Sequence, residues 1–486
     1  MSRSEPESGV FLDQKRLDLS GAKGEVKGFK VMSSVLVMGS GAREHALAWK
    51  LSQSPKVSHI IVAPGNPGMP AHWERWPLDL NAALGPQAEV IFSKLAHRAK
   101  QADVSLVVVG PDQPLSEGAV DQLKRAGLVV FGPQAQAARI ESSKSFAKQL
   151  MKQASIPTAR YWVAADIEEA RKILKSLPWG PSLRPKRSSS HSLGWVIKAD
   201  GLALGKGVRV CDRLDEALEA CQELGALCFP HNPRLVIEEK VSGQELSWMA
   251  FCDGSTCALL EPAQDYKRLL DGDLGPNTGG MGALSPVPGV PRSWFNRIRE
   301  EVFLPALREM KNLGHPFAGL LYAGLMVDWE ADRYWVLEFN ARFGDPETQV
   351  LLPRFKGDLL PWLMASAQGD LSGLPAEVPF EPDAAVYVVA GSQGYPQAPR
   401  LGQRIEIGAQ SPHPEVEMKG SAELPSYFFA GVKEDAERHL CSSGGRVMGA
   451  LGLAPSLAAA RQKAYENLSQ VRFDGMIWRS DIGCGL

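Results

Sequence analysis

A short apolar segment carries two polar residues whose types and spacing suit a divalent cation. In a β-strand, the side chains of Glu338 and Asn340 would face one side while Leu337 and Phe339 face the core. Oxygen ligands two residues apart suit Mg²⁺, which completes its octahedron with phosphate oxygens and water. Arg342 follows on the same side and can bind a carboxylate or a phosphoryl group through two hydrogen bonds. An ordinary edge strand would show the same pattern, so this interpretation depends on the other motifs.

A lysine on another predicted strand precedes a glycine-rich segment. Lys198 is followed by Gly205, Lys206 and Gly207 before the next apolar run. Glycines let the backbone approach triphosphate oxygens, and the lysine ammonium can neutralise their charge. The spacing is not that of a P-loop, and a hairpin over a nucleotide differs from a loop that opens a helix. The alternative is a mobile glycine hairpin without a ligand.

An apolar strand at residues 235–241 ends in carboxylates and a bend. The bend can present backbone donors and acceptors to an adenine edge, and Glu245 is suitably spaced to bind ribose hydroxyls. Taken alone, Glu238 and Glu239 would be interpreted as solvated acids. Their assignment to a nucleotide site therefore depends on the neighbouring motifs.

A glycine-rich loop at residues 276–282 follows the charged pair Asp265 and Lys267. This segment cannot form a regular element, and its backbone amides, close to Asn277 and Thr278, can surround an anionic intermediate. A simple linker is the alternative, which the mixed and closely set charges disfavour.

A first glycine cluster, Gly39-Ser40-Gly41, stands between a predicted strand and a helix whose free N–H groups can hold a phosphate. Glu44 occupies the position of the third glycine of a dinucleotide fingerprint and would interfere with tight packing of helix on strand. A small phosphorylated substrate is therefore favoured over NAD. A plain tight turn explains the glycines equally well.

The elements that must position these residues alternate in the first part of the chain. Strands are predicted at residues 35–38, 60–62, 104–109 and 128–131, and helices at 46–51 and 119–126. Such alternation predicts a parallel sheet covered on both faces, with ligands collected at the strand ends.

The rest of the chain mixes helices with strands in a different order. Helices are predicted around 146–151, 167–177 and 294–311, and strands at 195–198, 208–211, 235–241 and 246–252. A hairpin is predicted at 320–327 and 334–339, and a unit of short strands with a helix near 457–468 follows residue 374. The segment 181–192, rich in Pro, Ser and Arg, is predicted to be a surface insertion.

Composition places the chain among ordinary globular proteins. Its 486 residues correspond to roughly three domains, and its net charge of −2 lacks the basic excess of a nucleic-acid binder. There is no apolar run of membrane-spanning length and no signal-like N-terminus, so the cytoplasm is expected. The seven cysteines are expected to be reduced, and Cys221, Cys228 and His231 lack the Cys-x-x-Cys pair typical of zinc sites.

A set of segments along the chain carries a specific family resemblance. The chain contains, in order, GSGAREHALAWKLSQSP, APGNPG, VVVGPDQPL, ESSKSFAK, KADGLALGKGV, EEKVSGQE, DGDLGPNTGGMGALSP, YAGLMVD, EFNARFGDPETQ, SSGGRV and DGMIWRSDIG. These segments resemble the glycinamide ribonucleotide synthetase family of ATP-grasp enzymes and span the chain from about Ser34 to its end. PNTGGMG together with EFNARFGDPETQ is distinctive even among ATP-grasp enzymes.

The resemblance implies an α/β and α+β multidomain architecture. Its four parts are a doubly wound N-terminal α/β domain at 34–134, an ATP-grasp core at 135–157 and 243–375, a lid at 158–242 and a C-terminal mixed α/β domain at 376–486. Residues 1–33 are expected to be a disordered tail because their start is polar and has no sustained apolar period, and this tail has no family counterpart. An alternative translation start at Met32 is a further hypothesis.

The resemblance also implies a reaction. Glycine would be phosphorylated by ATP to glycyl phosphate, and the amine of 5-phosphoribosylamine would displace phosphate, giving glycinamide ribonucleotide in de novo purine biosynthesis. The expected metal is Mg²⁺ or Mn²⁺, and the expected state is a monomer or a weak dimer without nucleic-acid or membrane partners. The alternatives are another ATP-grasp carboxylate-amine ligase or carboxylase, and a nucleotide-binding regulator without catalysis.

The family's site residues carry over to matching positions. Nucleotide contacts are expected at Lys144, Lys198, Gly205, Lys206, Gly207, Glu238, Glu239, Val241 and Glu245, and metal ligands at Glu338 and Asn340. Contacts to glycine, the amine substrate or the intermediate are expected at Asp265, Lys267, Asn277, Thr278 and Arg342. The ribose phosphate is expected at Gly39, Ser40, Gly41, Gly65 and Asn66. The chain departs from the family pattern at Ala42, Asp112 and Leu204, of which Leu204 can affect lid closure.

Overall fold

The computed structural model describes residues 33–80, 82–83, 85–179, 194–202, 207–227, 234–408 and 424–485. Residues 1–32 of the predicted tail, the insertion at 181–192, and Leu204, Gly205, Lys206, Cys228 and His231 lie outside the described residues. Ser33, the last residue of the predicted tail, is instead the buried first residue of a strand, Ser33–Gly39. Among the described residues, no helix combines the length and the apolar character needed to cross a bilayer.

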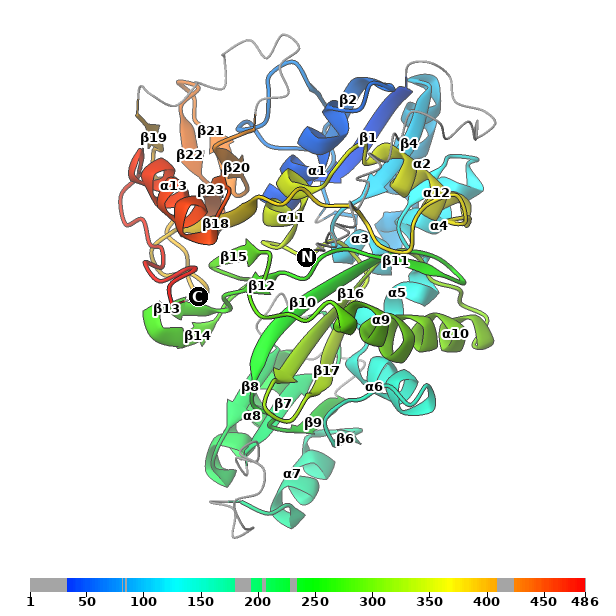
Figure 1. The fold of residues 1–486 in the computed structure, drawn as a ribbon, viewed down its shortest axis with the longest axis vertical. Coiled ribbons are helices and arrows are strands. Elements are labelled where there is room, and N and C mark those ends of the chain that lie inside the picture. Colours follow the sequence, from blue (N-terminus) through cyan, green and yellow to red (C-terminus); the bar gives the residue numbers. More distant parts are fainter. Residues whose placement is uncertain are drawn as a thin grey trace, which may run out of the picture. The chain divides into compact units, whose positions relative to one another are not determined.

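The N-terminal part is built on a five-stranded sheet in the order β3-β2-β1-β4-β5, of which β2, β1 and β4 are labelled in Figure 1. Its strands are β1 (Ser33–Gly39), β2 (Val57–Pro64), β3 (Glu74–Arg75), β4 (Val104–Val109) and β5 (Val130–Phe131). Its helices are α1 (Ala42–Ser52), α2 (Ala88–Gln101), α3 (Asp112–Ser116) and α4 (Ala119–Arg125). All four strand pairings are parallel. Four consecutive residues of β1, from Val35 to Met38, are fully buried, so the sheet is covered on both faces as predicted.

The glutamate expected to disturb the packing of α1 on the sheet does not do so. Glu44 is buried, and a Cβ atom at Gly39 or Gly110 would lie within 2.5 Å or 2.2 Å of its side chain. The two glycines therefore make room for the carboxylate, which accepts a hydrogen bond from the Gly41 N–H at 2.7 Å. The prediction that Glu44 would interfere with the packing of helix on strand was wrong. The glycines at the ends of two strands provide the space that a glycine on the helix would otherwise provide.

An antiparallel sheet, β11-β10-β16-β17, forms the centre of the next part. It contains β10 (Gln244–Asp253), β11 (Cys257–Leu259), β16 (Ala318–Asp328) and β17 (Arg333–Asn340). The adjoining helices are α5 (Ala135–Ser142), α6 (Lys144–Gln153), α9 (Ser293–Ile298) and α10 (Leu304–Asn312), with a π-helical segment at Arg299–Phe303 between the last two. The predicted hairpin of β16 and β17 and the predicted helix before it are confirmed.

A β-bulge on β17 changes the side to which one residue points. Gly324 pairs with Glu338 and Leu325 pairs with Val336, so Leu337 is an extra residue on β17. Phe339 is in the core as predicted, but Leu337 is half-buried and lines a cavity. The prediction for Leu337 was wrong because strict alternation does not continue through a bulge.

A smaller four-stranded sheet, β6-β9-β7-β8, has its own apolar core. It contains β6 (Tyr161–Ala164), β7 (Trp195–Ala199), β8 (Val208–Cys211) and β9 (Leu235–Glu239), with α7 (Ile167–Ser176) and α8 (Leu214–Leu227). All of these elements fall inside the range predicted for a lid, 158–242. The domain boundaries themselves stay a prediction.

The C-terminal part completes a sheet that begins in the middle of the chain. The order β12-β15-β18-β23-β20 joins β12 (Gln264–Asp265) and β15 (Gly282–Ser285) to β18 (Ala384–Gly391), β20 (Tyr427–Phe429) and β23 (Arg446–Ala454). The helices are α11 (Thr348–Arg354), α12 (Leu360–Gln368) and α13 (Leu457–Ser469). Three short strand pairs also form: β13 (Arg268–Leu270) with β14 (Leu274–Asn277), β19 (Glu406–Ile407) with β24 (Val471–Arg472), and β21 (Val432–Glu434) with β22 (Leu440–Ser442). This shared sheet brings the end of the chain next to the glycine-rich loop.

Candidate active site

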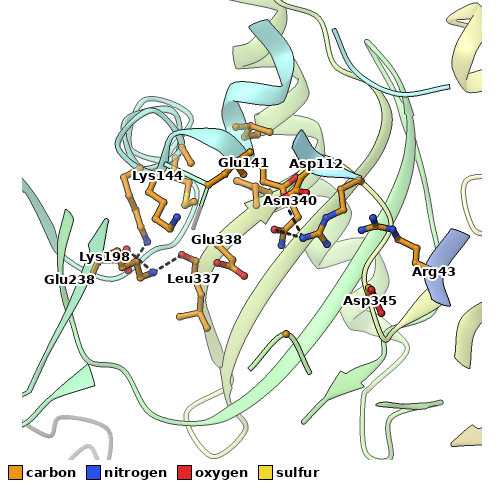
Figure 2. A pocket seen from close by; sticks show the side chains of 18 of the residues that line it. Arg43, Asp112, Glu141, Lys144, Lys198, Glu238, Leu337, Glu338, Asn340 and Asp345 are labelled. Carbon is orange, nitrogen blue, oxygen red and sulfur yellow. Dashed lines mark hydrogen bonds and ion pairs between the residues drawn. The ribbon is translucent and has the colours of Figure 1, made fainter. Parts of the chain in front are cut away.

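A polar cavity of about 300 Å³ lies where several parts of the chain meet (Figure 2). The charged and polar side chains that line it include Arg43, Asp112, Glu141, Lys144, Lys148, Lys198, Glu238, Glu338, Asn340, Arg342, Asp345 and Arg446. Six of the residues predicted from the sequence are therefore brought together: Lys144, Lys198, Glu238, Glu338, Asn340 and Arg342.

Glu338 and Asn340, the predicted metal ligands, both line the cavity from β17. Burial alone would raise the pKa of Glu338, but the nearby cations, led by Lys267 and Lys198, lower the pKa below its ordinary value. The carboxylate is therefore ionised at neutral pH, as a metal ligand must be. In Figure 2 the Glu338 carboxylate points into the open space of the cavity. A carboxylate and an amide oxygen on one strand fit a hard cation such as Mg²⁺.

Lys198 stands across the cavity on β7 and is held by two oxygen atoms. Its Nζ atom lies 2.8 Å from Glu238 Oε1 and donates to the Leu337 carbonyl at 3.2 Å. Leu337 is the bulged residue of β17, so its position outside the regular register presents this carbonyl to the lysine. The bulge therefore links β7, a strand of the predicted lid, to the strand that carries the predicted metal ligands.

Lys144 is the first residue of α6 and donates to the Gly201 carbonyl at 2.7 Å. Burial lowers the pKa of Lys144, and Glu338 acts in the opposite direction. Asp200 accepts hydrogen bonds from the hydroxyls of Ser143 and Ser145 at 3.2 Å and 2.5 Å. These contacts fix the start of the predicted glycine-rich segment against α6.

At the far end of that segment, the Gly207 carbonyl accepts a hydrogen bond from the Ala199 N–H at 2.8 Å, and Gly207 is buried. It does not belong to the cavity lining. Its predicted contact with the nucleotide stays a prediction.

Arg342 follows β17 and is paired with Glu141, for which no role was predicted from the sequence. Its Nη2 atom lies 3.0 Å from Glu141 Oε1, and the other oxygen of Glu141 accepts the Ala341 N–H at 2.7 Å. Burial raises the pKa of Glu141 to about 7, although Arg342 opposes this shift. Glu141 lies three residues before Lys144, but nothing in the local sequence indicates that it meets residue 342.

Asp265, Lys267, Asn277 and Thr278 lie beside the cavity and do not line it. Lys267 Nζ is 2.7 Å from Asp265 Oδ2, and the Lys267 carbonyl accepts hydrogen bonds from the N–H and hydroxyl of Thr278 at 2.7 Å and 2.9 Å. Burial raises the pKa of Asp265 to about 7, with Lys267 opposing the shift. Asn277 pairs with Arg268 in the β13–β14 hairpin. Their substrate contacts stay predictions.

Two residues from the C-terminal part hold the glycine-rich loop. The Gly279 N–H donates to the Tyr395 hydroxyl at 2.9 Å, and the Gly279 carbonyl accepts from Arg446 Nη1 at 2.6 Å. Arg446 also lies 2.7 Å from Asp345 Oδ2. No role could be predicted for Arg446 from its local segment, because its partners lie about a hundred residues or more away in the chain.

The predicted adenine and ribose residues other than Glu238 lie outside the cavity lining. Arg160 Nε and Nη2 each donate a hydrogen bond to one carboxylate oxygen of Glu239, both at 2.9 Å. Val241 and Glu245 are half-buried, and burial raises the pKa of Glu245 while Lys267 opposes the shift. Their contacts with a nucleotide stay predictions.

The residues predicted to hold a ribose phosphate come together at the ends of β1 and β2. The Gly65 N–H donates to the Gly39 carbonyl at 3.0 Å, and Asn66 Nδ2 donates to the Ser40 carbonyl at 2.8 Å and to the Phe429 carbonyl at 3.0 Å. The Asn66 side chain thus connects the N-terminal and C-terminal parts. Gly39, Ser40, Gly41, Gly65 and Asn66 do not line the cavity, and their contact with a phosphate stays a prediction.

From the N-terminal part, Arg43 and Asp112 reach the cavity instead of the glycine cluster. Arg43 Nε donates to Glu44 Oε1 at 2.6 Å, so the buried glutamate of α1 also orients this arginine. Arg43 was visible in the sequence only as part of the segment GSGAREH, and its position near Asp345 required the fold (Figure 2).

Comparison with known proteins agrees with this arrangement. Three family models match the chain: phosphoribosylglycinamide synthetase, N domain, at residues 33–141; its ATP-grasp (A) domain at 142–348; and its C domain at 385–485. The phosphoribosylamine–glycine ligase of Neisseria meningitidis serogroup B is 40% identical over 450 residues, covering 92% of this chain and 98% of the relative. That of Chlorobaculum tepidum is 41% identical over 458 residues, covering 92% and 99%.

Solved structures give the same result for the fold. The crystal structure of phosphoribosylamine–glycine ligase from Thermotoga maritima has a TM-score of 0.74 at 33% identity and covers 92% of this chain and 100% of that one. The biotin carboxylase domain of 2-oxoglutarate carboxylase from Hydrogenobacter thermophilus has a TM-score of 0.64 at 14% identity, covers 92% of each chain and shows similarity of fold alone. The family models and the relatives, which match nearly the whole described chain, show that the protein belongs to the phosphoribosylglycinamide synthetase family of ATP-grasp enzymes.

Proposed function

We propose that this protein ligates glycine to 5-phosphoribosylamine at the expense of ATP, giving glycinamide ribonucleotide, ADP and phosphate in purine biosynthesis. The observation that carries the proposal is the shared cavity, where Lys198, the pair Glu338 and Asn340, and Arg342 face one volume. The family membership and the names of the relatives support the choice of substrates.

The first step joins glycine to phosphate. A carboxylate oxygen of glycine attacks the γ-phosphorus of ATP, and the bond from that phosphorus to the β-phosphate oxygen breaks, which releases ADP. Phosphoryl transfer of this kind depends on positioned cations and needs no protein nucleophile. Lys144 and Lys198 bind the phosphate oxygens, and Arg342 faces the carboxylate or the transferring group. Glu338 and Asn340 would hold the metal ion, which would supply positive charge for the phosphate oxygens.

The second step forms the carbon–nitrogen bond. The amine of phosphoribosylamine attacks the carbonyl carbon of glycyl phosphate, phosphate leaves, and the nitrogen loses a proton. Because water would hydrolyse an acyl phosphate, the site must be closed during both steps. The small sheet that carries Lys198 and Glu238 acts as the lid, and the loop held by Tyr395 and Arg446 surrounds the intermediate.

The metal, the domain boundaries, the cellular location and the oligomeric state are also part of the proposal. Mg²⁺ is the proposed metal, in line with the MgADP named for the 2-oxoglutarate carboxylase neighbour, and Mn²⁺ is a proposed substitute. The proposed domains are residues 34–134, 135–157 with 243–375, 158–242 and 376–486. The proposed location is the cytoplasm, and the proposed state is a monomer or a weak dimer without nucleic-acid or membrane partners.

Substrate omission tests the proposal against its alternatives. With wild-type protein and MgATP, sustained ADP release is expected only when glycine and phosphoribosylamine are both present, because the glycyl phosphate formed with the first ADP occupies the site until the amine displaces its phosphate. ADP release supported by bicarbonate, or by another amino acid in place of glycine, would favour a different ATP-grasp ligase or carboxylase. Nucleotide binding without turnover under any of these conditions would favour a regulator.

A further inference from the structure

A buried cluster of three charged side chains joins the small lid sheet to the central sheet. Glu238 lies on β9, Lys198 on the neighbouring strand β7, and Lys148 on helix α6. Lys198 Nζ is 2.8 Å from one oxygen of Glu238, and Lys148 Nζ is 2.9 Å from the other oxygen. The side chains of Lys148 and Glu238 are each 2% exposed, so water cannot replace either partner.

Lys148 is also fixed to the central sheet. Its Nζ atom donates to Thr158 Oγ1 at 2.7 Å, and that hydroxyl donates to the Val336 carbonyl at 2.7 Å. Val336 directly precedes Leu337, whose carbonyl accepts from Lys198. Lys148 thus connects α6, the lid and the strand that carries the predicted metal ligands.

We propose that Lys148 is a positioning residue, which occupies one oxygen of Glu238 so that Lys198 keeps its ammonium in the cavity. This inference rests on the proposed role of Lys198 as a ligand of ATP phosphates. With both oxygens of Glu238 occupied, Lys198 pairs with one of them and retains hydrogen-bonding capacity for a phosphate. Without Lys148, the second oxygen would be buried and unpaired, and the nearest cation able to pair with it is Lys198.

The charge balance indicates that the loss of Lys148 costs the fold less than the loss of Glu238 would. Two ammonium groups face one carboxylate, and burial lowers the pKa of Lys148 to about 8 against the opposing effect of Glu238. Burial alone would raise the pKa of Glu238, but Lys198 and Lys148 lower it below its ordinary value. Removing Lys148 therefore leaves a neutral pair of Lys198 and Glu238, whereas removing Glu238 leaves two unpaired cations.

Lys148→Met is expected to weaken nucleotide binding more than it slows turnover. The dissociation constant for MgADP, measured by titration calorimetry on the full chain, should rise about tenfold or more, because Lys198 withdraws from the phosphates. Turnover at saturating MgATP should stay within about threefold of wild type. The matched control is Lys152→Met, which removes an exposed lysine one turn further along α6 and should leave both values unchanged. If Lys148→Met does not fold, Lys148→Gln gives the same comparison with a smaller change in polarity.

A double-variant comparison separates positioning from direct contact. If Lys148 acts only through Glu238, the variant with both Lys148→Met and Glu238→Gln should bind MgADP as Glu238→Gln alone does. A further loss of about tenfold in the double variant would show that Lys148 contacts the nucleotide itself and would overturn the proposal. Unchanged MgADP binding in Lys148→Met would overturn it as well. The MgADP titration uses nucleotide alone, so its outcome, unlike that of the turnover measurement, is independent of whether the wild-type protein ligates glycine.

Discussion

Glu338→Ala is expected to reduce turnover about a thousandfold while the protein remains folded. The carboxylate faces the cavity beside Asn340, and the cations around it keep it ionised, so its loss removes the proposed anionic ligand of the metal. A metal ion provides several kcal/mol of charge stabilisation in phosphoryl transfer, and about 4 kcal/mol corresponds to a thousandfold in rate. The measurement is the initial rate of ADP release at saturating glycine and phosphoribosylamine.

The matched control is Glu330→Ala in the turn between β16 and β17. Glu330 is an exposed glutamate of the same hairpin, so its removal should leave the rate unchanged. A melting temperature of Glu338→Ala within a few degrees of wild type would show that the loss is not a folding defect. Near-normal turnover of Glu338→Ala would show that the metal is bound elsewhere.

Lys198→Met is expected to lower kcat/KM for MgATP about a hundredfold. The lysine lies across the cavity from Glu338 and carries the charge that a triphosphate would meet when it enters between them. Unlike Lys148→Met, this change removes the proposed phosphate ligand itself, so turnover at saturating MgATP should fall together with affinity. Steady-state kinetics with varied MgATP separates the two effects.

Lys240→Met is the control for Lys198→Met, because Lys240 directly follows β9 and pairs with Asp212 at the surface. Its removal should change kcat/KM by less than about twofold, since surface ion pairs contribute little. A loss in Lys198→Met no larger than in this control would contradict the assignment of the lysine to the phosphates.

Local patterns predicted the elements and the cavity residues that stand on them. The alternation of polar and apolar residues in β17 predicted that Glu338 and Asn340 face one side. The apolar run before Lys198 predicted that this lysine lies on a strand. Both predictions required only the local residue pattern of a strand. Helix α2 was not predicted, although Phe92, Leu95, Ala96 and Ala99 are buried along it.

Features that depend on distant partners could not be predicted. The bulge at Leu337 arises from pairing with β16, and the alternation of the sequence gives no sign of it. Glu141 and Arg446 enter the site through contacts with Arg342 and Gly279, far away in the chain. Lys148 had a weaker signal, because it lies four residues after Lys144 on one face of α6 and thus near the same cavity.

The most direct test of the proposed reaction traces an oxygen atom from the glycine carboxylate to the released phosphate. If the cavity joins glycine to phosphate, glycine labelled with ¹⁸O in its carboxylate must pass one labelled oxygen to the released phosphate, because the bond from the carbonyl carbon to that oxygen breaks when the amine attacks. Mass spectrometry of phosphate from a complete reaction is expected to show one ¹⁸O per phosphate formed. Unlabelled phosphate, with ADP and glycinamide ribonucleotide formed at the normal rate, would contradict an acyl phosphate intermediate.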